Sequence, residues 1–280
     1  MSAVSEHRMA VVVMICFARS GGTVVNQCLA SLPGVVMLSE VNPLGGGWGK
    51  EGRDSPQTVK AQAKQWYDID LEANDFIESI LELEAICAKD GRYLVIRDWP
   101  FVNFVAHESN RNSPPNRLLT IEALAEKTEI IPFVLVRDAI DVWASRGNSP
   151  DEFFPSYLQF AQAVEGMKFF KFEDFGRRPG EVIRQICEYS GLPFSDAWSN
   201  YASYLKVSGD VQVKGGSRGA RQSWIKPLRR RRKSSSEIRA VNASPEMKAA
   251  NEIFGYPTSY EAAERESWLT SILQLWPYHP

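Results

Sequence analysis

Histidine and cysteine are scarce in this chain, with three and four copies among 280 residues. No two cysteines form a C-x-x-C pair, so a zinc site and a disulfide framework are both disfavoured. We expect no bound metal ion. Each cysteine falls within an apolar pattern, which is typical of buried thiols in a reducing compartment; the four are Cys16, Cys28, Cys87 and Cys187.

A membrane-length apolar run and a strong charge imbalance are also missing. The apolar segment 9–18 follows Arg8 but is shorter than the roughly 20 residues of a membrane helix. It leads into a glycine turn rather than a signal-peptide cleavage site. The net charge is −2, so no global field recruits nucleic acid or an acidic membrane, and any basic function must be local. These absences favour a cytoplasmic globular protein with no membrane span and no nucleic-acid partner.

What the chain does contain, near its start, is a buried-strand pattern that stops at a glycine turn. The apolar run 11–17 ends at Ala18-Arg19-Ser20-Gly21-Gly22-Thr23, where a helical pattern begins. A helix N-terminus offers unpaired backbone N–H groups and a dipole that favours anions. The guanidinium of Arg19 matches phosphate or sulfate oxygens. The segment predicts an anion-binding turn, although an ordinary turn with a surface arginine stays open.

The turn departs from the Walker A pattern G-x-x-x-x-G-K-[ST] at two positions. Cys16 stands where the first glycine would be, and Gly22 stands where the lysine would be. Because that lysine contacts the outer phosphates and the next hydroxyl holds magnesium, a magnesium-dependent nucleoside triphosphatase is disfavoured. An atypical P-loop kinase remains an alternative, and dependence of the activity on magnesium would distinguish it.

Apolar runs alternate with helical patterns along most of the chain. This alternation predicts an α/β, P-loop-like three-layer fold, with a mostly parallel central sheet flanked by helices on both faces. A length of 280 residues suits a single domain, 1–280, with a long basic loop at 205–236 and a helical tail at 244–275. The strands are expected at 9–17, 35–38, 93–96, 130–136 and 167–172, and the main helices at 22–32, 57–67, 73–88, 121–127, 156–166 and 178–190.

A second set of polar residues follows the fourth predicted strand. Arg137 ends this strand, and Ser145 lies two helical turns further on. In open α/β sheets, ligands bind beyond the carboxyl ends of the strands, so this pair and the first turn should line one crevice. Either Asp138 or Asp141 can cap the helix between them. A salt bridge from Arg137 to Asp141 is the alternative to phosphate binding.

Taken together, the segments around Arg19 and Arg137 resemble the sulfotransferase family that uses 3′-phosphoadenosine-5′-phosphosulfate (PAPS). The likeness continues in Phe170-Lys171-Phe172-Glu173-Asp174-Phe175 and covers most of the chain. Two positions depart from the family pattern, with Gly22 in place of a threonine or serine and Ala139 in place of a proline. Neither change removes a backbone donor.

The resemblance implies a nucleotide site built from both segments. Arg19 and the backbone of the first turn would hold the 5′-phosphosulfate, with a hydroxyl from Thr23. Arg137 and Ser145 would hold the 3′-phosphate, and a basic loop at 214–222 would close over the cosubstrate. The cosubstrate-binding residues that it implies are Arg19, Ser20, Gly21, Gly22, Thr23, Val24, Arg137, Ser145, Arg218 and Arg221.

The implied activity is transfer of a sulfuryl group from PAPS to a hydroxyl, with 3′-phosphoadenosine-5′-phosphate (PAP) as the second product. Such a transfer needs an in-line acceptor, a base and cations beside the departing phosphate. Arginines and backbone N–H groups can supply that charge without a metal. We assign Arg19 to the leaving group, with Arg97 as a second cation. The resemblance makes Glu40 the general base, with Asp98 in reserve; either carboxylate could instead serve a structural ion pair or turn.

The resemblance leaves the acceptor open among small molecules, carbohydrates and lipids that carry a hydroxyl. A non-enzymatic nucleotide- or polyanion-binding module is the remaining alternative, motivated by the basic run at 229–233. Such a run is also typical of a solvated face. Salt-dependent nucleic-acid binding that survives loss of Arg19 would identify the module. A homo-oligomer is also left open.

Overall fold

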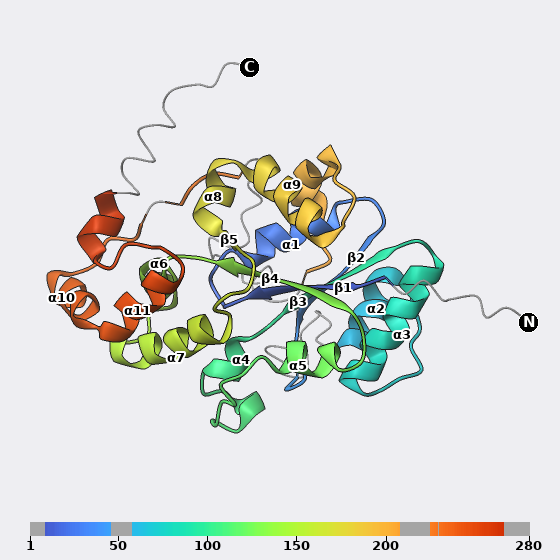
Figure 1. The fold of residues 1–280 in the computed structure, drawn as a ribbon, viewed down its shortest axis with the longest axis horizontal. Helices are drawn as coiled ribbons and strands as arrows, with labels where there is room; N and C mark the ends of the chain where they lie inside the picture. The colour runs from blue at the N-terminus through green and yellow to red at the C-terminus, as the bar shows by residue number, and fades with distance from the viewer. Residues whose placement is uncertain (1–8, 46–57, 208–224, 229, 266–280) are drawn as a thin grey trace, which may run out of the picture.

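The computed structural model describes residues 9–45, 58–207, 225–228 and 230–265. At its centre is a sheet of five parallel strands in the order β2-β3-β1-β4-β5 (Figure 1). The first strand therefore lies between the third and the fourth. All five strands predicted from the sequence are present: β1 (Val11–Cys16), β2 (Val35–Val41), β3 (Tyr93–Asp98), β4 (Ile130–Val136) and β5 (Phe169–Lys171).

Strand β1 is buried on both faces, which explains why its sequence is a continuous apolar run. Successive side chains of a strand point to opposite faces. The odd-numbered residues of β1 pack into a larger apolar core on one face of the sheet, and the even-numbered residues pack into a smaller core on the other. The sheet thus forms the middle layer of three.

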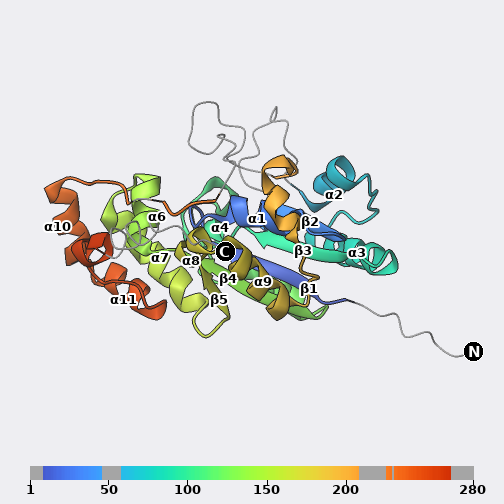
Figure 2. The ribbon, with the colours of Figure 1, turned by 90° about the horizontal axis from the view of Figure 1, so that it is seen from above.

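Helices cover both faces of this sheet, which confirms the predicted α/β fold class. In Figure 1, α1, α8 and α9 lie above the sheet and α4, α5 and α7 lie below it, while α10 and α11 pack beside α6 and α7 at one end. Figure 2 shows the same end from above. The smaller core is covered by α1 (Gly22–Ala30), α8 (Phe172–Arg177), α9 (Pro179–Ser190) and the 3₁₀ helix η2 (Asp196–Ser203). The larger core is covered by α2 (Val59–Tyr67), α3 (Phe76–Lys89), α4 (Phe101–Phe104), α5 (Leu119–Ala125), α6 (Ala139–Arg146), α7 (Pro150–Ala163), α10 (Ser235–Ala243) and α11 (Pro245–Ile253).

Two predicted elements have different ends in the structure. The helix expected at 156–166 already begins at Pro150, because the Ser149 side chain accepts a hydrogen bond from the Glu152 N–H and proline fits the first helical turn. The strand expected at 167–172 ends at Lys171, and Phe172 begins the short helix α8. Helix α8 was not expected from the sequence.

The long basic loop expected at 205–236 overlaps the start of a helix by two residues. Helix α10 begins at Ser235, where Ser234 and Glu237 form a reciprocal capping box. This S-x-x-E pattern was visible in the sequence and could have placed the start of the helix. Residues 214–222, with Arg218 and Arg221, lie outside the described residues. None of the helices in the described part of the chain is both long enough and apolar enough to cross a membrane.

The cysteines behave as their apolar surroundings predicted. All four are buried and none is in a disulfide. Burial raises the pKa of Cys16 to about 11, an effect that the nearby Arg97 guanidinium partly opposes. Burial likewise raises the pKa of Cys87 and of Cys187 to about 11. The thiols therefore stay protonated at neutral pH and act as small apolar core residues.

Phe17 anchors the glycine turn in the core. It is completely buried and follows β1 directly. Its ring packs edge-on against Tyr157 and Phe101, with ring centroids 5.2 and 5.8 Å away. Tyr157 in turn donates a hydrogen bond from its hydroxyl to the carbonyl oxygen of Arg137 at 2.7 Å. One aromatic cluster therefore contacts the chain after β1 and the end of β4.

Replacing Phe17 with alanine should lower the free energy of unfolding by about 3–5 kcal/mol, because it removes a buried ring and leaves a cavity. Urea-induced unfolding of the variant and of the wild type measures this difference. The Phe17→Leu variant keeps most of the side-chain volume and should lose less stability. A loss below about 1 kcal/mol for Phe17→Ala, the size of an ordinary substitution, would contradict the support role.

Candidate functional site

The carboxyl ends of the parallel strands meet at one edge of the sheet, and polar residues gather there. Arg19 follows β1, and Glu40 lies near the end of β2. Arg97 is close to the end of β3, and Arg137 directly follows β4. This edge is where open α/β sheets bind their ligands, so the fold brings four of the predicted functional segments to one place.

The turn between β1 and α1 has an unusual backbone. Arg19 and Gly21 both have a positive φ, of 79° and 85°. A Cβ on Gly21 would lie 2.1 Å from the ring of Phe172, so a glycine is required there by conformation and by space. The Ser20 N–H donates to the Phe17 carbonyl oxygen at 3.2 Å and is thus used within the turn.

Helix α1 begins without a neutralising side chain. Gly21 is its N-cap, no side chain caps its first turn, and that turn holds no acidic residue. The N–H groups at the start of a helix have no intrahelical acceptor, and the helix dipole is positive there. Thr23 and Val24 lie in this first turn. The sequence-predicted anion-binding turn therefore has the donors that an anion requires.

Arg19, Ser145 and Arg137 come together although they are far apart in the chain. The Nε and Nη2 atoms of Arg19 donate to the Oγ of Ser145 at 2.9 and 2.7 Å. Arg137 Nη1 donates to the carbonyl oxygen of Arg19 at 3.1 Å. The two segments that the sequence marked as phosphate-binding are thus direct neighbours.

Arg137 is held in place by its surroundings while part of its guanidinium remains unused. The residue is 9% exposed, and its guanidinium carbon lies 5.3 Å from the centre of the Phe172 ring. Its Nε is buried and has no hydrogen-bond partner among the described residues. A buried donor without an acceptor is costly. An anion bound here would supply that acceptor.

Glu40 owes its position to an irregularity at the end of β2. The pairing of β2 with β3 shifts register between Ser39 and Val41, which leaves Glu40 as the extra residue of a bulge with a φ of 54°. Its Oε1 accepts a hydrogen bond from Arg97 Nη2 at 2.6 Å. Arg97 Nη1 also donates to the Thr23 hydroxyl at 3.3 Å. Arg97 therefore connects Glu40 to the first turn of α1.

The glycine at position 22 makes room for this connection. A Cβ on Gly22 would lie 2.8 Å from Arg97 Nε and 2.6 Å from Cys16 Sγ. Contacts that short force a neighbour to move, and here both neighbours are buried. Gly22 is thus required by packing, although its φ is negative enough for any residue to adopt.

Asp98 lies on the other side of the sheet from Arg97. Adjacent residues of a strand point to opposite faces, and Asp98 is completely buried. Its Oδ1 accepts hydrogen bonds from Asn42 Nδ2 at 3.0 Å and from the Thr120 hydroxyl at 2.7 Å. Burial raises the pKa of Asp98 to about 6, although these two hydrogen bonds oppose the rise. This environment favours a structural role for Asp98 and leaves Glu40 as the carboxylate beside the first turn.

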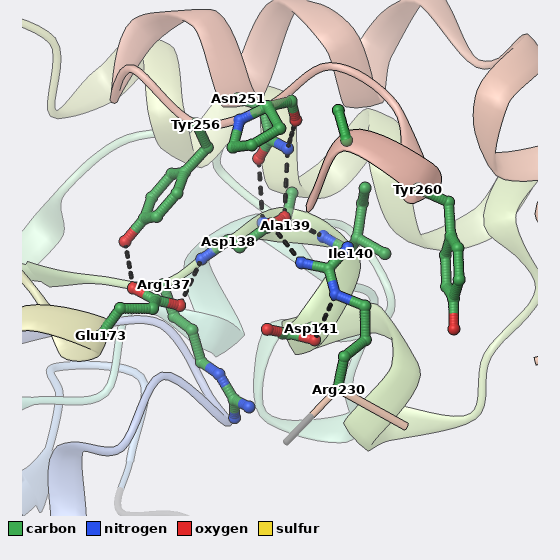
Figure 3. Close-up of polar contacts among 12 residues, drawn as sticks. Arg137, Asp138, Ala139, Ile140, Asp141, Glu173, Arg230, Asn251, Tyr256 and Tyr260 are labelled. Carbon is green, nitrogen blue, oxygen red and sulfur yellow. Dashed lines mark hydrogen bonds and ion pairs between the residues drawn. The ribbon is translucent and has the colours of Figure 1, made fainter. Parts of the chain in front are cut away.

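A buried polar network behind Arg137 was not foreseen from the sequence (Figure 3). Asp138 caps α6 by accepting from the Ile140 N–H at 2.9 Å, and Asn251 Nδ2 donates to the same carboxylate at 3.1 Å. Glu173 accepts hydrogen bonds from the Asp138 N–H at 3.3 Å and from the Tyr256 hydroxyl at 2.5 Å. Burial raises the pKa of Glu173 to about 7. This network fixes the turn that presents Arg137.

The basic run at 229–233 is not simply a solvated face. The Arg230 side chain is 5% exposed and forms ion pairs with Asp138 and, from Nε to Oδ1 at 3.2 Å, with Asp141. Asp141 therefore pairs with Arg230, which overturns the alternative in which it would pair with Arg137. Arg229 lies outside the described residues. No local sequence signal distinguished Arg230 from its basic neighbours.

Comparisons with known proteins agree on the fold. No protein-family model matches the sequence, and no curated protein matches it. Among solved structures, the sulfotransferase domain of the Synechococcus PCC 7002 olefin synthase is similar, with 16% identity, a TM-score of 0.52 and 98% of each chain covered. The sulfotransferase domain from the curacin biosynthetic pathway shows 13% identity and a TM-score of 0.52 over 89% of this chain and 98% of that one. At such identities the likeness establishes the fold, which is that of sulfotransferase domains.

The environment of Asp98 predicts that the stability of the folded protein falls as the pH rises through 6. The raised pKa of about 6 lies above the ordinary value of 3.8, so the folded state binds this proton more tightly than the unfolded state. The stabilisation is complete below about pH 4 and is lost as the pH rises through 6. The Asp98→Asn variant keeps the Oδ1 acceptor but cannot ionise. Between pH 5 and pH 8, the wild type should therefore lose about 1 kcal/mol more stability than the variant.

Urea-induced unfolding of both proteins at several pH values tests this expectation. Other carboxyl groups titrate in the same range, but they contribute equally to both proteins and cancel in the difference. Parallel pH profiles for the wild type and Asp98→Asn would contradict a proton held by Asp98.

Proposed function

We propose that this chain is a PAPS-dependent sulfotransferase that moves a sulfuryl group to a hydroxyl acceptor. The observation that supports this most directly is the meeting of Arg19, Arg137 and Ser145 at the carboxyl edge of the sheet. The sulfotransferase resemblance assigns the two segments to opposite ends of one doubly phosphorylated nucleotide. Their contact lets a single ligand reach both, in a chain with the fold of sulfotransferase domains.

The donors at this edge fit an anionic cosubstrate. Arg19 and Arg137 supply two guanidinium groups, and the buried Nε of Arg137 has no hydrogen-bond partner among the described residues. Ser145 supplies a hydroxyl, and the uncapped start of α1 supplies backbone N–H groups without an opposing acidic side chain. We assign Arg137 and Ser145 to the 3′-phosphate. Arg19 and the first turn of α1, with Thr23, are assigned to the 5′-phosphosulfate.

The proposed reaction is an in-line displacement at sulfur, for which PAPS supplies the sulfuryl group. The acceptor oxygen forms a new bond to sulfur while the bond from sulfur to the phosphate oxygen breaks. That phosphate oxygen keeps the bonding electron pair, and Arg19 stabilises its charge. The acceptor proton passes to a carboxylate of the protein. The chain's own cations supply the charge stabilisation, so the proposal needs no metal.

Glu40 is the proposed base. Its bulged position at the end of β2 aims the carboxylate at Arg97, which also contacts Thr23 in the first turn of α1. The Glu40 side chain is 13% exposed, so an acceptor bound at this edge of the sheet could reach it. Asp98 has no exposed surface and fits this role less well. The acceptor that Glu40 would deprotonate is a hydroxyl of a small molecule, carbohydrate or lipid.

Replacing Arg137 with alanine should weaken the binding of PAP roughly 10- to 100-fold, the usual size for loss of a hydrogen bond to a charged group. Isothermal titration calorimetry measures the dissociation constant. Arg178 is exposed, pairs with Glu181 and is not assigned to the nucleotide, so Arg178→Ala is the matched control and should bind as the wild type does. Equal PAP affinity in Arg137→Ala and the wild type would remove the assignment, and a wild type that does not bind PAP would remove the proposed function.

Replacing Glu40 with glutamine should lower kcat about 10²- to 10⁴-fold, because the amide cannot take the acceptor proton. The affinity for PAP should change little, since Glu40 is not assigned to the nucleotide. Turnover is followed with radiolabelled PAPS and an acceptor chosen from a screen of hydroxyl compounds, with EDTA present. Full turnover in Glu40→Gln would move the base to Asp98. Sulfuryl transfer by the wild type that stops in EDTA would contradict the proposal that the chain's own cations stabilise the leaving group, and no transfer from PAPS with or without magnesium would favour the kinase alternative.

A further inference from the structure

Two carboxylates lie beside the arginine that the proposed function assigns to the 3′-phosphate. Asp138 precedes α6, and Asp141 lies in its first turn, four residues after Arg137. Residues four apart near a helix start are well placed to form an ion pair. Both carboxylates are nearly buried. Without a cationic partner, these carboxylates would repel a phosphate and attract the Arg137 guanidinium that should bind it.

Arg230, from a distant part of the chain, forms ion pairs with both carboxylates. Its guanidinium pairs with Asp138 and with Asp141, and its side chain is as buried as that of Asp138 and more buried than that of Asp141. Figure 3 shows the Arg230 side chain on one side of Asp141 and the Arg137 side chain on the other, with the dashed ion pair of Asp141 drawn to Arg230. Arg230 therefore pairs with both carboxylates, whereas Arg137 donates to the Arg19 carbonyl oxygen.

The approach of Arg230 is fixed by its own neighbours. Its guanidinium lies 5.5 Å from the centre of the Tyr260 ring. The Tyr260 hydroxyl donates to the backbone carbonyl of Arg231 at 2.8 Å, so the chain beside Arg230 is anchored as well. Lys233 contacts the same helix α6, with its Nζ 4.2 Å from the centre of the Trp143 ring. The segment is thus packed along α6 rather than extended into solvent.

The two carboxylates differ in what else supports them. Asp138 accepts hydrogen bonds from the Ile140 N–H and from Asn251 Nδ2 in addition to its ion pair. Asp141 pairs with Arg230 among the described residues. Burial raises the pKa of Asp141, and Arg230 opposes that rise. Asp141 is therefore the carboxylate whose charge depends most on Arg230.

We propose that Arg230 is a positioning residue that neutralises the carboxylates at the start of α6, so that the Arg137 guanidinium stays available for the 3′-phosphate of the nucleotide. The proposal rests on the proposed function, because it assigns a partner to a residue of that same site. Arg230 itself touches no substrate. Its loss would let Arg137 turn to Asp141, and the site would lose selectivity for the 3′-phosphate rather than nucleotide binding as a whole.

The test compares two nucleotides in calorimetry: PAP, with both phosphates, and AMP, which lacks the 3′-phosphate. The Arg230→Met variant should bind PAP about tenfold more weakly, the effect of losing a hydrogen bond to a charged group, while its AMP affinity stays close to that of the wild type. Adding Asp141→Asn removes the carboxylate that competes for Arg137, so the double variant should recover PAP binding. Arg232, an exposed member of the same run, gives the matched control Arg232→Met, which should bind PAP as the wild type does.

Unchanged PAP affinity in Arg230→Met would overturn the proposal. An equal loss of PAP and AMP affinity without rescue by Asp141→Asn would also overturn it, because that is the pattern of a merely structural residue. If Arg230→Met does not fold, Arg230→Gln replaces it in the same comparison: a loss of PAP affinity that spares AMP and is restored by Asp141→Asn supports the proposal, and any other pattern overturns it. A wild type that does not bind PAP would refute the proposed function itself, whereas PAP binding that depends on Arg137 but not on Arg230 refutes this inference alone.

Discussion

The parallel pairing of β1 with both β3 and β4 is the constraint on which the site depends. Parallel strands end at the same edge, so the residues after β1, β3 and β4 must be neighbours whatever their separation in the chain. This is how Arg19 reaches Ser145 across 126 positions. The apolar β1 run is therefore more than core: its register decides which polar groups meet.

Charged groups at this edge divide into two sets with different tasks. Arg97 and Arg230 pair with carboxylates, at 2.6 Å from Glu40 and 3.2 Å from Asp141. Arg19 and Arg137 instead contact a hydroxyl and a backbone carbonyl. A buried carboxylate costs several kcal/mol unless it is paired and hydrogen-bonded. The first set meets that cost, and the second set is the one that we propose to bind an anion.

The sequence predicted the strands, and it pointed to the two proposed binding segments, because their signals are local. Buried parallel strands are short apolar runs, and the turn at Arg19 and the Arg137–Ser145 pair each lie within one continuous segment. The role of Arg230 carries no such signal, since its partner Asp138 is 92 residues away and its basic neighbours look the same. Arg97 and Asp98 show the same limit within one strand: they are adjacent, and only the sheet decides that Arg97 faces α1 while Asp98 faces α5.

The residues at positions 22, 40 and 97 depend on one another through direct contacts. A side chain at position 22 would occupy the space of the Arg97 guanidinium. Without Arg97, Glu40 in the bulge at the end of β2 would lose the ion pair that it now makes. The glycine that departs from the sulfotransferase pattern is thus explained by the arginine that lies against it. A threonine or serine at position 22 would need room from both Cys16 and Arg97, and loss of Arg97 would also release the carboxylate that we propose as the base.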